Sequence, residues 1–478
     1  RGGPQTSDMY TMTEYISRQD SILTVVVMVD DPLYLTEPYI QSLTFQLDIH
    51  AQVQLEPCTS SFDENGGADP HFVPHYLPGK NEFLTEWLEK QPWIPAEATR
   101  GGADTLYPEY RSKLDGSSAA KPAAPPVSKS ALSPDRLIAA ESPKDGEVHV
   151  LPVQGNVYML VADGSNITVS IGPDGFLLVD AGSARMTDKV LATIKQLAVT
   201  VAAPTAPNRC MGLHCAGTYE WSSPFMNTII SSPAPAKPIR YIINTSSDMD
   251  HTGGNEKLAA AGTFYVGGCI GPGCELHRLD TFAAVIAHEN VLNRMSTPPA
   301  GQAARTPEAW PTDTYHRQFY KLTSYFNGEP VVVYHEPNAH TDGDSIVYFR
   351  HSEVIAAGEI FSTVSYPVID FEKGGSIQGI IDGLNNILDL AVAEYRSQGG
   401  TWIVPGRGRL SDVADVASYR NTVVMIRDRI QDMMKSGMTL DQIKAAKPSL
   451  DFDGRYGSTS GSWTTDMFIE AVYRSLKK

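Results

Sequence analysis

The segment around residue 250 constrains the fold of this chain more than any other part of the sequence. A strand-length apolar run, Ile239–Ile243, leads into a polar loop that reads Asn244-Thr-Ser-Ser-Asp-Met-Asp-His-Thr-Gly-Gly-Asn255. A short helix is expected directly after this loop, over Glu256–Ala261. Carboxylate and imidazole groups gathered at the end of a buried strand are typical of a metal or catalytic site.

Strands and helices alternate around this loop, which predicts an α/β domain over residues 136–410. Four strand-length runs come first, and a helix is expected after them over Met186–Leu197. The pattern becomes helical after residue 410, with helices expected over Asp412–Ser436, Thr439–Ala446 and Thr465–Leu476. Thr439 and Gln442 have the spacing of a capping box.

The remaining parts of the chain predict a small module and a linker before the α/β domain. Residues 1–112 contain three β-branched or aromatic runs and are expected to form a β-rich module. Residues 113–135 are rich in Pro, Ala and Ser and are expected to form a semi-rigid linker. The predicted organisation is therefore a β-rich module (1–112), a linker (113–135), an α/β domain (136–410) and a helical C-terminal extension (411–478).

Composition excludes some classes of function. The formal net charge is −17 and no run of Lys and Arg offsets it, so a nucleic-acid-binding protein is not expected. No apolar stretch reaches the roughly 18 residues that a membrane-spanning helix needs. The chain begins Arg1-Gly-Gly-Pro4 with neither an initiator Met nor a signal peptide. We expect an exported protein, periplasmic or extracellular, whose leader has been removed.

Four of the five cysteines form two C-x4-C pairs, Cys210 with Cys215 and Cys269 with Cys274. We expect disulfides in the loops of an exported protein, with a connectivity that spacing does not reveal. The alternative is a zinc site completed by histidines, although C-x4-C lies at the edge of the usual zinc spacing.

Further motifs occur in order along about 250 residues. Asp180-Ala-Gly182 ends a strand before the loop, and three segments follow it: His340-Thr-Asp-Gly-Asp344, Gly358-Glu-Ile-Phe361 and Pro405-Gly-Arg-Gly408. Together with the loop they resemble the motifs of the metallo-β-lactamase superfamily, whose central signature is T-H-x-H-x-D-H-x-G-G. The resemblance implies a four-layer αββα sandwich with a metal site.

The chain departs from this family's pattern at four of the seven metal positions. Ser246 and Asp248 stand where the first two histidines belong, Glu359 replaces the bridging Asp, and Arg407 replaces the last His. The family residues are retained at Asp250, His251 and His340.

The resemblance therefore implies a mononuclear site. The ligand set would be Asp248, Asp250, His251, His340 and Glu359, a mixture of imidazoles and carboxylates that suits one Zn, Mn or Fe ion. Arg407 is always cationic and cannot be a ligand, but it could supply the charge of a second metal by pairing with Asp250 or Glu359. Asp250 would orient the attacking water or accept its proton.

Two functions follow from these residues. The first is a metal-dependent hydrolase of an ester, amide, thioester or phosphoester bond in a small molecule. The second is a non-catalytic subunit of an exported assembly or homo-oligomer, in which the carboxylates are balanced by Arg407 and no metal binds. A redox enzyme of the flavodiiron type is disfavoured, because no flavodoxin-like module follows the domain.

His288 and His335 are expected to be structural, with His288 inside a helix.

Overall fold

The structure is a computed structural model that describes residues 10–19, 22–31, 35, 37–46, 71–78, 80–81, 89–90, 145–172, 174–202, 238–263, 282–297, 305–322, 326–392 and 400–477. The chain divides into two compact units. One comprises Arg1–Phe72 and Gln91–Pro122, and the other comprises Val73–Lys90 and Ala123–Lys478. The linker, all five cysteines and the boundaries predicted at 112 and 135 lie outside the described residues.

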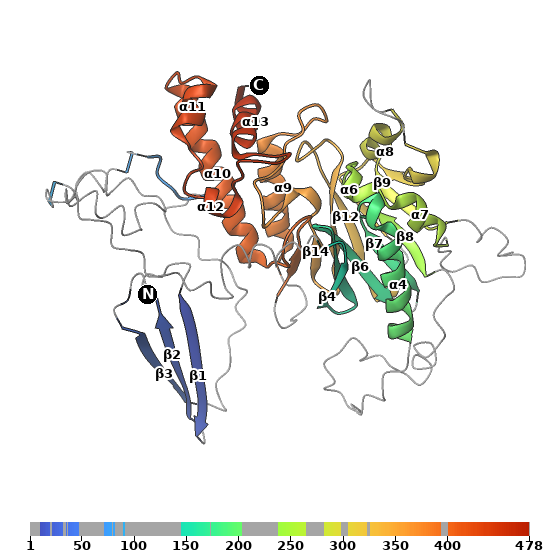
Figure 1. The fold of residues 1–478 in the computed structure, drawn as a ribbon, viewed down its shortest axis with the longest axis horizontal. Coiled ribbons are helices and arrows are strands. Elements are labelled where there is room, and N and C mark those ends of the chain that lie inside the picture. Colours follow the sequence, from blue (N-terminus) through green and yellow to red (C-terminus); the bar gives the residue numbers. More distant parts are fainter. Residues whose placement is uncertain are drawn as a thin grey trace, which may run out of the picture. The chain divides into compact units, whose positions relative to one another are not determined.

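The first unit contains an antiparallel sheet of three strands in the order β1-β2-β3 (Figure 1). The strands are β1 (Thr11–Gln19), β2 (Ile22–Asp30) and β3 (Tyr39–Gln46). Ile16, Val25 and Leu43 are in register across it, so alternation places apolar side chains together on one face. Ile16 is 65% exposed and Phe45 is 52% exposed. The predicted β-rich module is thus present, with an apolar face open to solvent.

The second unit is built on two sheets. The larger has seven strands in the order β10-β9-β8-β7-β6-β5-β4. Its strands are β4 (Val148–Gln154), β5 (Val157–Ala162), β6 (Ser165–Gly172), β7 (Gly175–Val179), β8 (Ile239–Ile243), β9 (Ala284–His288) and β10 (Asp313–Tyr315). Strands β4 to β7 form an antiparallel meander, whereas β7, β8, β9 and β10 are parallel. The carboxyl ends of β7, β8 and β9 therefore lie at one edge.

The smaller sheet has five strands in the order β11-β12-β13-β14-β15. They are β11 (Phe319–Lys321), β12 (Val331–Glu336), β13 (Asp344–Phe349), β14 (Val354–Ala356) and β15 (Trp402–Val404). One hydrophobic cluster joins the facing sides of both sheets, with Leu177 and Ile243 from the larger and Val333 and Val347 from the smaller. All four side chains are 0% exposed, so this cluster forms the hydrophobic core between the two sheets of a sandwich.

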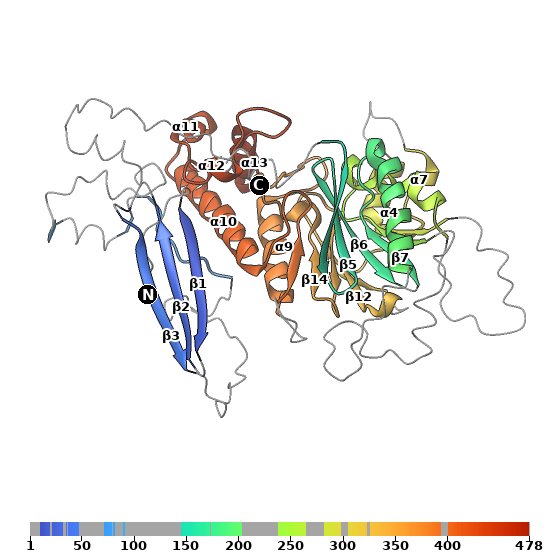
Figure 2. The ribbon, with the colours of Figure 1, turned by 60° about the horizontal axis from the view of Figure 1, so that its bottom comes forward.

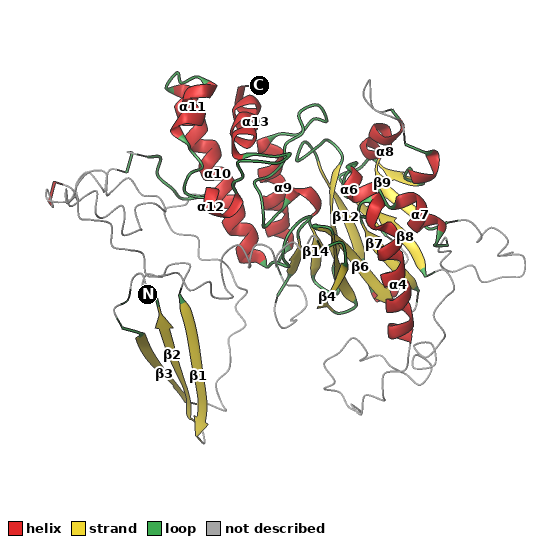
Figure 3. Cartoon of the chain, in the orientation of Figure 1, coloured by secondary structure: helices red, strands yellow, loops and turns green. Residues whose placement is uncertain are grey.

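Helices cover the two outer faces (Figures 2 and 3). The larger sheet packs against α4 (Thr187–Ala202) and α7 (Asn255–Ala260). On the smaller sheet, α9 (Ile377–Leu390) packs against β12, and three further helices share its hydrophobic cluster: α10 (Val413–Lys435), α11 (Leu440–Ala446) and α13 (Thr465–Lys477). The predicted αββα architecture is confirmed.

Short elements complete the unit. They are α6 (Met249–Thr252), α8 (Glu289–Ser296), α12 (Asp453–Tyr456) and the 3-10 turns η3 (Ala184–Met186), η4 (Pro307–Ala309), η5 (Phe326–Gly328) and η6 (Gly358–Ile360). The capping box of Thr439 and Gln442 is present at the start of α11. No described helix has the length and apolar character that crossing a membrane requires.

The C-terminal helices share the core of the smaller sheet. Phe468 of α13 is 0% exposed and its ring stacks on Tyr366 with centroids 4.5 Å apart. Tyr366 in turn donates a hydrogen bond to Asp453 at 2.8 Å. The residues after 410 therefore form part of the outer helical layer.

We predict that Phe468→Ala lowers the free energy of unfolding by about 3–5 kcal/mol, because it removes a buried ring and leaves a cavity. Chemical denaturation measures this loss. Met467→Ala is the matched control, since Met467 is the preceding residue and is 43% exposed. Equal effects of the two substitutions would contradict the shared core.

Candidate metal centre

The site lies at the edge where β7 and β8 end. These strands are parallel, with Val179 opposite Ile243, so the residues that follow them meet. Asp180 follows β7 with a φ of 68°. Its carboxylate accepts hydrogen bonds from Thr245 N at 2.8 Å and Thr245 Oγ1 at 2.7 Å. Asp180 therefore anchors the loop that follows β8.

His251 is completely buried between two carboxylates. Its Nδ1 is 2.7 Å from Asp180 Oδ2, and its Nε2 is 2.7 Å from Glu359 Oε1. Burial alone would lower the pKa of His251, but the charge of Asp180 and the hydrogen bonds with Asp180 and Glu359 outweigh burial and raise it well above the usual value. A buried carboxylate behind Nδ1 sets the orientation of the ring and leaves Nε2 to face the site.

Glu359 is placed by the turn η6. Gly358 has a φ of 54°, and a Cβ there would lie 2.7 Å from Thr245 Oγ1, so only glycine fits against the anchored loop. Burial would raise the pKa of Glu359, but His251 and Arg407 lower it to about 2. The carboxylate is therefore ionised.

Asp250 and Arg407 complete this half of the site. Arg407 donates a hydrogen bond to Asp250, and its Nε lies 3.3 Å from Glu359 Oε1. The ligand atoms of Asp250, His251 and Glu359 all lie within 4.8 Å of one another. This is the only group of three or more ligand-type side chains that converges in the part of the chain that the structure describes.

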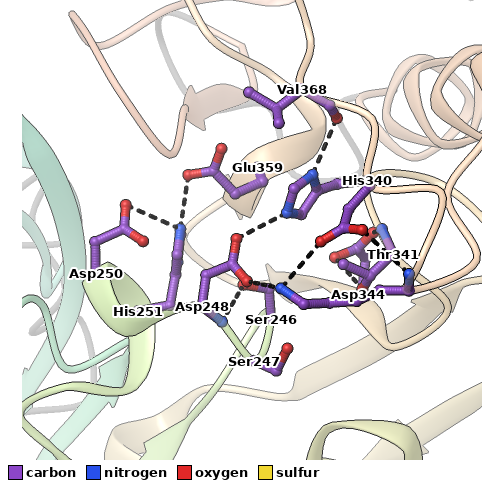
Figure 4. A network of polar contacts seen from close by, with 12 residues as sticks. Ser246, Ser247, Asp248, Asp250, His251, His340, Thr341, Asp344, Glu359 and Val368 are labelled. Carbon is purple, nitrogen blue, oxygen red and sulfur yellow. Dashed lines mark hydrogen bonds and ion pairs between the residues drawn. The ribbon is translucent and has the colours of Figure 1, made fainter. Parts of the chain in front are cut away.

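The other predicted ligands form a second cluster (Figure 4). Asp248 Oδ2 is 2.8 Å from His340 Nε2, and Asp248 Oδ1 accepts a hydrogen bond from Lys373 Nζ at 2.7 Å. His340 Nδ1 faces the carbonyl oxygen of Val368 at 3.0 Å. Burial would lower the pKa of His340, but Asp248 and other carboxylates raise it to about 10.

Ser246 is also buried, and its hydroxyl accepts a hydrogen bond from the backbone N of Asp248 at 3.2 Å. It therefore stabilises the turn of the loop. The structure brings the ligand-type side chains of Asp250, His251 and Glu359 together, while Asp248 and His340 are hydrogen-bonded to each other.

The residues present fit one metal ion at Asp250, His251 and Glu359. One imidazole and two carboxylates are donors that Zn, Mn and Fe accept. Asp180 provides the carboxylate behind the imidazole that oriented histidine ligands use. Arg407 pairs with both Asp250 and Glu359, so a metal ion at this position would compete with the guanidinium for these two carboxylates.

Sequence reasoning missed two residues beside the site, Lys373 and Arg305, and gave no role to Asp180. Lys373 lies in a turn 125 positions from Asp248 and follows no motif. Arg305 donates hydrogen bonds to Thr252 Oγ1 and, at 2.5 Å, to the Ser247 carbonyl oxygen. The structural role of Asp180 was signalled only by its place in the strand-end motif.

The prediction that His288 lies in a helix is wrong. It is the last residue of β9, and its Nδ1 accepts a hydrogen bond from Asn290 N at 3.3 Å at the start of α8. Its ring stacks on His335 of β12 with centroids 3.6 Å apart and an interplanar angle of 7°. The apolar run before His288 is too short for periodicity to distinguish strand from helix.

Comparisons with known proteins agree with this architecture. A family model described as the metallo-beta-lactamase superfamily matches residues 152–427, more than half of the chain. The chain therefore belongs to the metallo-beta-lactamase superfamily, as its motifs predicted. No match was found among curated protein sequences.

Several solved structures are similar in fold. A double mutant of the sec-alkyl sulfatase PisA1 gives a TM-score of 0.42 with 14% identity, covering 68% of this chain and 50% of that chain. The metallo-beta-lactamase from Pontibacter korlensis gives a TM-score of 0.36 with 14% identity, covering 58% of this chain and 99% of that chain. The DIM-1 metallo-beta-lactamase gives a TM-score of 0.37 with 13% identity, covering 58% of this chain and 97% of that chain. The chain thus matches about half the length of the alkylsulfatase.

We predict that acid destabilises the fold partly through His288. Burial, together with the neighbouring charge of His335, lowers the pKa of His288 from 6.5 to about 4. The folded state therefore binds a proton at the His288 ring less tightly than the unfolded chain does. The resulting stability is complete above pH 6.5 and declines as the pH falls towards 4.

Unfolding free energies between pH 7 and pH 4 measure this effect. The free energy of unfolding should depend less steeply on pH in His288→Gln. The slope should fall by a fraction of the ~1.4 kcal/mol per pH unit that one proton can contribute. His149→Gln serves as the control, because His149 has a side chain that is 43% exposed. An unchanged slope in His288→Gln would contradict the prediction.

Proposed function

We propose that the chain is a hydrolase that uses one divalent metal ion held by Asp250, His251 and Glu359. The observation that carries the proposal is the convergence of these three ligand atoms within 4.8 Å around an imidazole oriented by Asp180. Membership of the metallo-beta-lactamase superfamily supports it. The substrate would be a small molecule with an ester, amide, thioester or phosphoester bond.

Each residue has a chemical task in this proposal. When bound, the ion would supply Lewis-acid activation of water and of the bond to be broken. Asp250 would orient the attacking water or accept its proton. Arg407, whose side chain is 39% exposed beside Asp250, would stabilise negative charge that develops on a substrate oxygen.

The site is proposed to be mononuclear. The cluster at Asp248 offers one imidazole, because Ser246 is turned into the loop backbone. Lys373 already pairs with Asp248. A second ion would therefore have to displace an ammonium group and would find too few donors to replace its hydration shell.

Metal analysis of the purified full chain tests the proposal. We predict about one Zn, Mn or Fe ion per chain after reconstitution, and none in the Asp250→Ala, His251→Ala double variant, since two of three ligands are lost. Plasma mass spectrometry gives the stoichiometry. The control is His149→Ala, which removes an imidazole that pairs with Asp145 at 2.8 Å outside the site.

Hydrolysis of ester and phosphoester substrates should follow metal content in these proteins. If the wild-type chain takes up no ion from any of the three metals, the hydrolase proposal fails.

We further predict that Arg407→Gln increases metal affinity by about tenfold or more. The guanidinium bonds both Asp250 and Glu359, so its removal frees two ligands and removes a positive charge. Titration with a competing chelator measures the affinity. Arg407→Lys keeps the charge and should change the affinity less, whereas a lower affinity in Arg407→Gln would show that the guanidinium supports the ion.

A second candidate function is a non-catalytic subunit of an exported assembly. It is favoured by the ion pairs of the site, where Arg407 already pairs with Asp250 and Glu359, and Lys373 with Asp248. The exposed apolar face of the β1–β3 sheet would supply a contact surface. A monodisperse monomer at high concentration in light scattering would argue against it.

A further inference from the structure

Asn166 is a buried polar residue that lies where β6 continues past the end of β7. The last pair between these two strands joins Thr168 to Val179, so β7 has already ended at the level of Asn166. Asn166 is only 5% exposed. Asparagine is uncommon in strands, and a buried amide costs free energy unless hydrogen bonds satisfy it. Asn166 must therefore obtain its hydrogen bonds from another part of the chain.

Asn166 obtains these hydrogen bonds from the turn at residues 405–408. Its Nδ2 donates to the carbonyl oxygens of Pro405 and Gly408, at 2.9 Å each. Its backbone N donates to the Gly406 carbonyl oxygen at 3.0 Å. The opposite orientation of the amide would bring Oδ1 against two carbonyl oxygens, so the side chain must act as a donor to both. Three of the four carbonyl groups of the 405–408 turn are thus bound by one residue.

Arg407 lies within this turn, and its backbone is also held from a second segment. The Arg407 carbonyl oxygen accepts a hydrogen bond from Thr363 N at 3.2 Å. Gly408 follows with a φ of 101°, and a Cβ at this position would collide with Thr363 Oγ1. Gly406 N donates to the Gly358 carbonyl oxygen at 2.9 Å, which ties the turn to η6. The backbone at Arg407 is therefore fixed on both sides.

The ion pairs of the Arg407 guanidinium depend on this fixed backbone. The guanidinium donates to Asp250, and its Nε lies 3.3 Å from Glu359 Oε1. The Arg407 side chain is 39% exposed, so solvent screens both ion pairs. A long side chain also loses rotamer entropy when its charged end is held in place. A backbone that is already ordered lowers the total cost of holding the guanidinium, and Asn166 supplies much of that order.

We infer that Asn166 is a positioning residue for Arg407. It keeps the 405–408 turn in place, so that the guanidinium stays on Asp250 and Glu359 instead of moving into solvent. Through Arg407, Asn166 determines how readily these two carboxylates become available to a metal ion. The inference rests on the proposed function for the identity of that ligand.

A double-mutant cycle on metal affinity tests the coupling between Asn166 and Arg407. Asn166→Ala should raise the affinity of the full chain for Zn by about fivefold, the scale of one lost hydrogen bond, because the loosened guanidinium competes less for the carboxylates. The same substitution in an Arg407→Gln chain should change the affinity little, since the competing group is already absent. Titration with a competing chelator measures both affinities.

A second readout needs no metal. The Nε–H group of Arg407 faces Glu359, so its hydrogen exchange should be slow in chelator-treated protein. NMR of protein labelled at its arginine nitrogens measures this exchange, and Arg407→Gln identifies the signal by removing it. Asn166→Ala should accelerate the exchange by about fivefold or more, because the guanidinium leaves the carboxylates more often.

Asn156→Ala is the matched control. Asn156 lies at the other end of the β5–β6 hairpin, and its Nδ2 also donates two hydrogen bonds, to Ser170 Oγ and to the Asn327 carbonyl oxygen, at 3.3 Å each. This substitution should change neither readout. Asn166→Ser is the milder variant to use if Asn166→Ala does not fold, and it should shift both readouts in the same direction. Circular dichroism verifies the folding of each variant.

The outcomes separate this inference from the proposed function. In a chain that binds Zn, an equal change in affinity with and without Arg407, or no change in either background, overturns the inference. Unchanged hydrogen exchange at Arg407 Nε in both Asn166 variants also overturns it. Exchange that depends on Asn166 in a chain that takes up no Zn, Mn or Fe supports the positioning role, while the missing metal contradicts the hydrolase proposal.

Discussion

The hydrogen bond between Asp180 and His251 is the interaction on which the site depends. Asp180 is 3% exposed, so its charge must be fully satisfied by donors, and Thr245 and His251 supply them. These bonds fix the loop after β8 against the end of β7. They also direct His251 Nε2 at Glu359, which a glycine at 358 allows to approach. The two sheets of the sandwich are thus joined at their edge through one buried imidazole.

The ion pairs of the site determine whether its carboxylates are available to a metal ion. Asp250 and Glu359 share Arg407, and Asp248 shares Lys373, so each carboxylate is already stabilised by a side chain of the protein. Such partly exposed ion pairs add little net stability, because solvent screens the charges and desolvation offsets their attraction. A hydrolase would replace part of this charge with a metal ion, whereas a non-catalytic subunit would keep the ion pairs. Both uses rest on the same buried geometry.

The fold was predictable because its signals are local and repeated. The polar loop after Ile239–Ile243 and the motifs at His340 and Pro405 each follow a strand, and alternating strands and helices leave few other architectures. His288 was misassigned since a short apolar run next to a helix fits either element. Lys373 and Arg305 had no signal, because each reaches the site from a turn or loop far along the chain.

The αββα class and the set of ligand-type side chains could be predicted, since both depend on residue type and on spacing near each strand. How these side chains divide into groups follows from the packing of the two sheets. Asp250, His251 and Glu359 converge, while Asp248 pairs with His340 and Lys373. The physical reason is that hydrogen bonds between residues about 100 positions apart depend on how the two sheets pack, and no spacing along the chain encodes that distance.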